Sequence, residues 1–260
     1  MFSTGSNSKI YPQLSKMKLY SDDFGYNKQA DAGIIKLIRR GRIFGASVLA
    51  TMVSASSLRR LLYTLEQKNN FILGLHINLI EGYPTQHFLK ISTLVDRDGR
   101  FFSLIFFLAN LFLGRINKNQ IKSEIEGQLS KLLKKGLIVK MLDSHQHTHA
   151  FSPVAEITVD IARKYNISYI RSFGSIKNYS FKAKLTYAVI RVLAFLSYLA
   201  VYRKFGLPAT WRSKQEFDWT VMSWESNTFD IDSVNKNRSA FVIHPYLPYD
   251  TNRSYRSFIK

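Results

Sequence analysis

The stretch KLYSDDFGYN, residues 18–27, sets the pattern of the chain. Its first three residues are typical of a β-strand, and the polar segment SDDFG follows them. A helix is predicted over residues 29–40, because apolar side chains cluster on one side of it and Gly41 is a common helix terminator. Strand, polar turn and amphipathic helix together form a βα unit, from which parallel α/β folds are built.

The same alternation continues along the chain. Further strands are predicted at residues 47–52, 71–76, 138–142, 168–171 and 240–243. Helices are predicted at 57–67, 120–135 and 153–165, and a long loop covers residues 80–100. This rhythm predicts an α/β fold, either a parallel (β/α) barrel or an open parallel sheet.

The composition predicts a globular chain with a strongly basic surface. The 260 residues are 46% hydrophobic, which is enough for a sizeable core. Because cysteine is absent, any metal ion must be held by His and carboxylate ligands. The formal net charge of +19 favours anionic partners, such as phosphate-bearing substrates or lipid headgroups. No nucleic-acid-binding motif accompanies that charge, so we expect no nucleic acid partner.

Two apolar segments raise the question of a membrane. We expect a flexible extension at residues 1–16, without the apolar core of a signal peptide, and a single domain at 17–260. The apolar segment 101–113 is too short to span a bilayer, and the second, 185–202, is marginal in length. The second segment lies in an apolar helical insertion near residues 181–204. A spanning helix, an interfacial helix flanked by cations and a buried helix all remain open for it.

The ionisable candidates for a functional site follow the predicted strands. They are Asp22, Asp23, His76, Asp143, His145, His147, His149, Arg171 and His244. The ends of parallel strands converge in space, so residues far apart in the sequence can form one site there.

The cluster DSHQHTH, residues 143–149, is the sharpest single signal. Three of the six histidines of the chain stand at alternate positions in it. On an extended segment, alternate side chains share a face, so these imidazoles can bind one cation or support residues that do. A polar loop with surface histidines is the alternative interpretation. His76, alone at the end of a strand, is a weaker candidate.

The adjacent aspartates, Asp22 and Asp23, have two interpretations. Asp is common before a helix and in turns, but one residue is enough for that role. Two neighbouring carboxylates point in different directions, so one can bind a cation while the other accepts a proton, as in hydrolytic metal sites.

Several motifs together resemble those of the YdjC-like carbohydrate deacetylases. They are SDDFG with Asn27, GLHINLIEG at 74–82, LDSHQHTH at 142–149 with Pro153, IRS at 170–172 and HP at 244–245. Their order and spacing match over residues 18–245. The resemblance implies an often irregular (β/α) barrel that holds a divalent cation. It also implies that the protein uses this cation to hydrolyse the N-acetyl group of a sugar.

The resemblance also implies roles for individual residues. Asp23, His76 and His145 correspond to the metal ligands, and Asp22 corresponds to the catalytic base. The family points to Mg²⁺, whereas the mixed carboxylate and imidazole ligands also suit Zn²⁺, Mn²⁺ or Co²⁺.

Other residues are expected to complete this chemistry. His244 is the candidate general acid, with a structural histidine as the alternative. Arg171 is expected to orient Asp22 by a charge-assisted bond, unless it forms only a surface pair. Asp143 is expected to fix the tautomer of a ligand histidine. His147 and His149 are expected to support the ligands or contact the substrate.

The chain departs from the family pattern in two places. Ser21 stands where a small Ala is usual, and the sequence ends at Lys260, soon after the HP pair. We therefore expect a barrel that is incomplete or that a partner copy closes, as in a homo-oligomer.

These expectations lead to two functions. The first is a metal-dependent deacetylase of an N-acetylated oligosaccharide or a lipid-linked sugar, cytoplasmic and peripheral at an anionic membrane surface. The second is a non-catalytic protein on the same scaffold that binds a glycan or a membrane surface.

Overall fold

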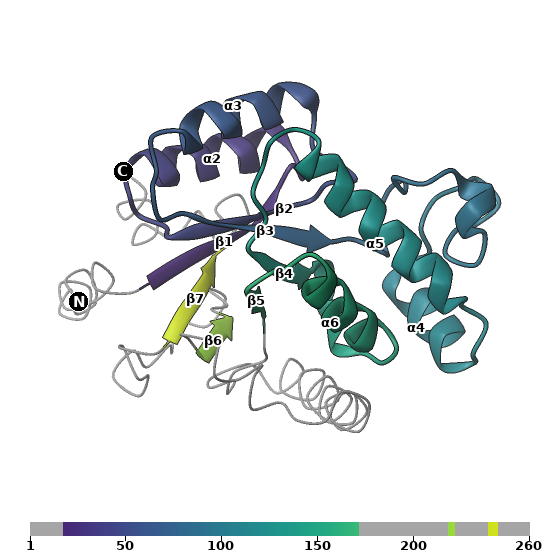
Figure 1. Ribbon diagram of the computed structural model, residues 1–260. Helices are drawn as coiled ribbons and strands as arrows, with labels where there is room; N and C mark the ends of the chain where they lie inside the picture. Colours follow the sequence, from purple (N-terminus) through teal and green to yellow (C-terminus); the bar gives the residue numbers. More distant parts are fainter. Residues whose placement is uncertain (1–17, 172–217, 222–238, 244–260) are drawn as a thin grey trace, which may run out of the picture.

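The computed structural model describes residues 18–171, 218–221 and 239–243, and its strands and helices alternate along most of that length (Figure 1). The strands are β1 (Lys18–Phe24), β2 (Gly45–Val48), β3 (Ile72–Ile77), β4 (Met141–Ser144), β5 (Tyr169–Ile170), β6 (Asp218–Val221) and β7 (Ser239–Ile243). The helices are α2 (Lys28–Arg39), α3 (Ala55–Leu65), η1 (Phe88–Ile91), α4 (Leu104–Phe112), α5 (Lys118–Leu133), η2 (His145–Ala150) and α6 (Val154–Lys164). The predicted N-terminal extension, the apolar insertion near 181–204 and His244 lie outside the described residues.

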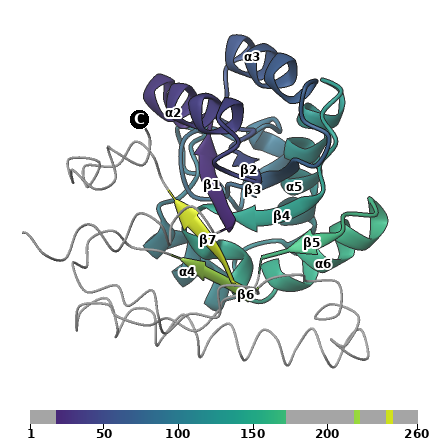
Figure 2. The ribbon, with the colours of Figure 1, turned by 90° about the vertical axis from the view of Figure 1, so that its left-hand side faces the viewer.

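The described strands form one parallel sheet. Its order is β5-β4-β3-β2-β1-β7-β6, and each pair of neighbours is parallel. The sheet curves, with α2, α3, α5 and α6 on its outer side (Figure 2). The α/β class predicted from the sequence is confirmed, and β5 and β6 are the edges of the sheet in the described part of the chain. Closure into a barrel stays a prediction.

The core explains why the amphipathic segments form helices here. Helix α2 is capped by Asn27, whose side chain accepts a hydrogen bond from the backbone N–H of Ala30. Its apolar stripe, including Ile34 and Leu37, is buried in the main hydrophobic core. Burial of each such side chain contributes about 1.5–3 kcal/mol, which is more than helix propensity alone provides.

The inner side of the sheet carries a large buried ring at β1. Tyr20 lies across two glycines, Gly45 of the neighbouring strand β2 and Gly74 of the next strand, β3. A Cβ atom on Gly45 would come within 2.5 Å of the Tyr20 ring, and one on Gly74 would collide with its hydroxyl. The guanidinium carbon of Arg171 lies 5.5 Å from the centre of the same ring. The two glycines therefore leave room for the Tyr20 ring, which packs against the guanidinium of Arg171.

Some element boundaries differ from the sequence prediction. Strand β1 continues through both aspartates to Phe24, although Asp is a poor strand former. Strand β2 ends at Val48 and β4 begins at Met141, so both are shorter than predicted. Strand β6 had not been predicted at all. At β1, tertiary contacts override local propensity, because Asp22 contacts buried Arg171 and Asp23 contacts two buried histidines.

The apolar stretch predicted at 101–113 contains helix α4. Phe107 and Leu111 are buried, whereas Ile105, Phe106 and Phe112 are exposed. None of the helices in the described residues combines the length and the hydrophobicity that crossing a bilayer requires.

Candidate metal centre

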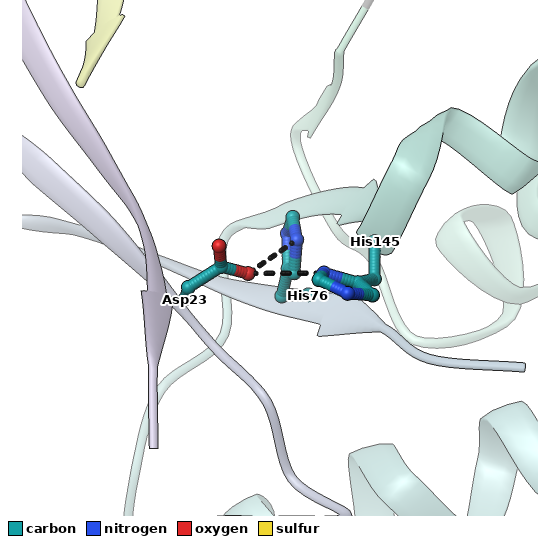
Figure 3. A group of neighbouring side chains, drawn as sticks. All are labelled: Asp23, His76 and His145. Carbon is teal, nitrogen blue, oxygen red and sulfur yellow. Dashed lines mark hydrogen bonds and ion pairs between the residues drawn. The ribbon is translucent and has the colours of Figure 1, made fainter. Parts of the chain in front are cut away.

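Three side chains meet at the carboxyl ends of β1, β3 and β4, as the parallel topology predicts. The carboxylate of Asp23 contacts the rings of both His76 and His145 (Figure 3). Its Oδ1 atom is 3.1 Å from Nε2 of His76 and 3.1 Å from Nδ1 of His145. One ligand atom of each residue lies within 4.8 Å of the others, and all three residues are buried. We call Asp23, His76 and His145 the metal centre.

Local backbone geometry separates the two aspartates of β1. Asp23 has a φ of +66°, a left-handed conformation that Asp tolerates better than most residues. The register of β1 against β2 shifts between Ser21 and Phe24, around the paired aspartates. Asp23 therefore faces the two imidazoles, while Asp22 contacts Arg171.

The segment that follows β4 is not extended, contrary to the prediction. Residues 145–150 form η2, interrupted by left-handed conformations at Gln146 and His147. Alternate side chains consequently do not share a face, and of the three clustered histidines only His145 belongs to the metal centre. His147 is half-buried in the left-handed part of the turn.

Each imidazole of the metal centre has a second carboxylate on its other nitrogen. Nδ1 of His76 lies 2.7 Å from Oδ1 of Asp143, as the expected tautomer-fixing role requires. Nε2 of His145 lies 2.9 Å from Oε2 of Glu81. Histidine ligands of metal ions commonly donate their remaining N–H to a carboxylate, which turns the other nitrogen toward the cation. Glu81 was not among the predicted site residues, although it stands in the GLHINLIEG motif.

Arg171 is buried beside the metal centre and contacts two carboxylates. It donates to both carboxylate oxygens of Asp22, over 2.6 and 2.5 Å, and it also donates to Asp143. Arg171 is only 2% exposed, so these contacts are buried ion pairs and not a surface pair. Burial alone would lower the pKa of this guanidinium, but Asp143 and Asp22 outweigh burial and raise it. Arg171 is therefore a permanent positive charge that holds Asp22 in one orientation.

The carboxylates control the protonation of the centre. Burial opposes a charge on His76, but Asp143, Asp22 and Asp23 together raise its pKa to about 10. Burial likewise opposes protonation of His145, and hydrogen bonds to Asp23 and Glu81 raise its pKa nevertheless. The surroundings of both rings therefore favour positive charge, which a proton or a metal cation can supply.

The donor set fits a divalent cation. One carboxylate and two imidazoles are ligands for Zn²⁺, Mn²⁺ and related ions. A second group, formed by Asp22, His76 and Asp143, is also close enough to share an ion. Arg171 already donates to both carboxylates of that second group. The metal centre with Asp23 is therefore the better candidate among the described residues.

His149 has a different environment from His145. Its Nε2 atom donates to the backbone carbonyl of Arg171 over 3.1 Å, and its Nδ1 atom contacts the hydroxyl of Ser144. The same hydroxyl accepts the backbone N–H of His149 over 2.9 Å. Burial, followed by the charges of His147 and Arg171, lowers the pKa of His149 to about 3. We call Ser144, His149 and the Arg171 carbonyl the anchor, because this neutral group ties η2 to the end of β5.

The described part of β7 ends just before the predicted general acid. Ile243 pairs with Ser21 of β1, next to the paired aspartates. His244, the following residue, lies outside the described residues, so its role stays a prediction.

The fold and the site define a class of protein: a parallel α/β protein that carries, at its strand ends, a buried Asp-His-His group able to hold a metal ion. Within that class, the model of the YdjC-like proteins matches residues 16–256. The chain therefore belongs to the YdjC-like protein family, as its motifs had indicated.

The relatives of this chain include several curated carbohydrate deacetylases. That of Danio rerio is 31% identical over 157 residues, which are 60% of this chain and 49% of the relative. That of Xenopus laevis is 24% identical over 259 residues, covering 90% of this chain and 82% of the relative. The match thus spans about half the length of the Danio rerio protein and more of the Xenopus laevis one.

A solved structure shares the fold. It is a protein from Enterococcus faecalis that is provisionally described as acting in cellobiose-phosphate cleavage. The two chains superpose with a TM-score of 0.59 at 19% identity, over 88% of this chain and 80% of the other.

Proposed function

We propose that the protein removes the acetyl group from an N-acetylated sugar, with a divalent cation held by Asp23, His76 and His145. The observation that carries this proposal is the geometry of the two imidazoles. Each faces Asp23 with one nitrogen and a carboxylate with the other. The carbohydrate deacetylases among the relatives supply the substrate class. When bound, the cation would lower the pKa of a water molecule and polarise the acetyl carbonyl.

Asp22 is the proposed general base. Arg171 donates to both of its oxygens, and the Ser47 hydroxyl donates to Oδ1 over 3.3 Å. These bonds hold the carboxylate in one position, so that it can accept a proton from the attacking water. The Tyr20 ring beneath Arg171 limits the movement of this pair.

The overall reaction consumes one water molecule. The water oxygen bonds to the acetyl carbon, the C–N bond breaks, and the products are acetate and a free sugar amine. The leaving nitrogen must gain a proton, and we propose that His244 donates it. Mg²⁺ is the proposed cation by family resemblance, while the two imidazoles also favour Zn²⁺ or Mn²⁺.

Release of acetate is the direct test. N-acetylated chitooligosaccharides, incubated with purified protein, should yield acetate and free amines. EDTA should stop the release, and added divalent cation should restore it. The protein with Asp22→Asn is the matched control for contaminating activity. Binding of the oligosaccharide without any release would favour the non-catalytic glycan-binding protein instead.

We further propose that the sugar is carried by a lipid at the cytoplasmic face of a membrane. Helix α4 supports the membrane contact that this substrate requires, because Ile105, Phe106 and Phe112 are exposed on it. Arg115 and Lys118 follow that helix and are exposed as well. Near an anionic leaflet each such cation contributes about 1 kcal/mol of attraction, and inserted apolar side chains add to it.

Sedimentation with vesicles tests the membrane proposal. The protein should pellet with phosphatidylserine vesicles at low salt, and the double variant Arg115→Glu with Lys118→Glu should pellet less. If the unaltered protein stays in the supernatant, a free oligosaccharide is the substrate. If the protein is a dimer whose interface covers α4, the apolar face serves assembly instead.

A further inference from the structure

Glu81 is a carboxylate beside the metal centre to which the proposed mechanism assigns no role. We propose that Glu81 is a positioning residue, which holds the outer nitrogen of His145 so that the inner nitrogen faces the cation. This inference rests on the proposed metal-dependent function. It adds a residue that sets how tightly the chain holds its metal.

The contacts of His145 carry the first step. Its two ring nitrogens point to different carboxylates, with Nδ1 3.1 Å from Asp23 and Nε2 2.9 Å from Glu81. A carboxylate on Nε2 keeps the proton on that nitrogen and leaves the lone pair of Nδ1 for a metal ion. The His145 ring also lies beside two other rings, 5.6 Å from that of His76 and 6.2 Å from that of Tyr26.

Glu81 itself is held from two sides. The Tyr26 hydroxyl donates to its carboxylate. The side chain of Asn78 clamps its backbone, because Oδ1 of Asn78 accepts from the N–H of Glu81 over 3.1 Å and Nδ2 donates to its carbonyl over 2.7 Å. A residue whose backbone and side chain are both fixed can orient a ligand ring.

The clamp is in turn fastened to α5. Gln128 donates to the carbonyl of Asn78 over 2.6 Å and accepts its backbone N–H over 3.0 Å. Glu124 accepts the backbone N–H groups of Thr85 and Gln86, both over 2.9 Å. The loop after β3 is therefore hydrogen-bonded to α5 both before and after Glu81. These contacts with a distant helix set the position of Glu81.

The two supporting carboxylates of the centre differ in setting. Asp143, which supports His76, lies within β4 and is fully buried. Glu81 lies in a loop, and its side chain is 37% exposed. Substitution of Glu81 should therefore leave the fold intact, whereas substitution of Asp143 also removes a partner of buried Arg171. This difference makes Glu81 the residue at which positioning can be measured without unfolding the protein.

Titration of the metal-free protein with Mn²⁺ tests the proposal, with unbound Mn²⁺ measured by electron paramagnetic resonance. Glu81→Ala should weaken Mn²⁺ binding about 10–100-fold. Glu81→Gln should recover part of that loss, because its amide oxygen can still accept the N–H of His145. Glu126→Ala is the matched control, since Glu126 pairs with Lys164 on the outer surface, and it should bind as the unaltered protein does.

The role of the clamp is tested by a double-mutant cycle. Asn78→Ala should weaken Mn²⁺ binding in the same direction, and the double variant with Glu81→Ala should lose little more than Glu81→Ala alone. Fully additive losses would overturn the link between Asn78 and Glu81. Circular dichroism of each variant checks that the fold is retained.

The outcomes separate this inference from the proposed function. If the unaltered protein binds Mn²⁺ and Glu81→Ala binds it equally tightly, Glu81 has no positioning role and the proposed function stands. If the unaltered protein binds no Mn²⁺, Zn²⁺ or Mg²⁺ at all, the metal centre is wrong and the role of Glu81 falls with it.

Discussion

His145 and His149 belong to the same short turn after β4, yet they lie in opposite chemical environments. His145 joins the metal centre, where its two nitrogens face the carboxylates of Asp23 and Glu81. His149 belongs to the anchor, where its partners are a serine hydroxyl and a backbone carbonyl. The left-handed residues between them turn the second ring away from the first.

The difference shows that neighbouring carboxylates decide whether the pKa of a buried histidine rises or falls. Burial lowers the pKa of both His76 and His149. Three carboxylates raise the pKa of His76 to about 10, whereas the pKa of His149, which contacts a serine hydroxyl and a backbone carbonyl, falls to about 3. The first environment favours a cation, and the second favours a neutral ring that serves as a structural tie.

Metal content should separate the metal centre from the anchor most strongly. His76→Ala should abolish stoichiometric metal binding, because a ligand is lost, while far-UV circular dichroism stays largely unchanged. Ser144→Ala, in the anchor, should keep the full metal content. Elemental analysis after dialysis measures both. Equal metal content in the two variants would contradict the division into metal centre and anchor.

The next effect concerns turnover. Asp22→Asn should keep the metal but lower kcat by about 100-fold or more, since proton transfer from the water is lost. Steady-state acetate release at saturating substrate measures it. Near-normal turnover would assign the base to another residue.

A smaller effect is expected on stability in the anchor. Ser144→Ala removes the hydroxyl that accepts the backbone N–H of His149 and contacts its Nδ1 atom. The free energy of unfolding in urea should fall by about 1–3 kcal/mol, because buried polar atoms lose their partner. An unchanged free energy of unfolding would show that the anchor does not stabilise the fold.

The smallest effect is a pH dependence of stability. The folded pKa of His149 is about 3, below the value of 6.5 for a free histidine, so its contribution is complete above pH 6.5 and is lost as the pH falls toward 3. As the pH falls from 6 to 5, protonation of His149 in the unfolded chain should lower the free energy of unfolding by about 1 kcal/mol. In the metal-free protein, the free energy of unfolding, measured in urea, should change less steeply with pH in the His149→Gln variant. Identical slopes would mean that His149 is not held neutral.

The site was only partly readable from the sequence. Asp23, His76 and His145 were carried over from the family motifs, and the structure brings them together as one buried group. The contacts of Arg171 with Asp22 and of Asp143 with His76 match their expected partners. Glu81 was missed, because a single Glu in a loop has no periodic signal and its partner lies 64 residues away.

Local sequence patterns were enough to predict the alternation of strands and helices, the α/β class and the family. Those features depend on hydrophobic periodicity, turn residues and motif spacing, which are local properties of the chain. Three other features could be seen only in the folded protein: β1 runs through both aspartates, η2 is a kinked turn, and His149 and His145 contact different partners. These depend on which buried partners compensate each polar side chain, and such partners come from distant strands that only the folded sheet brings together.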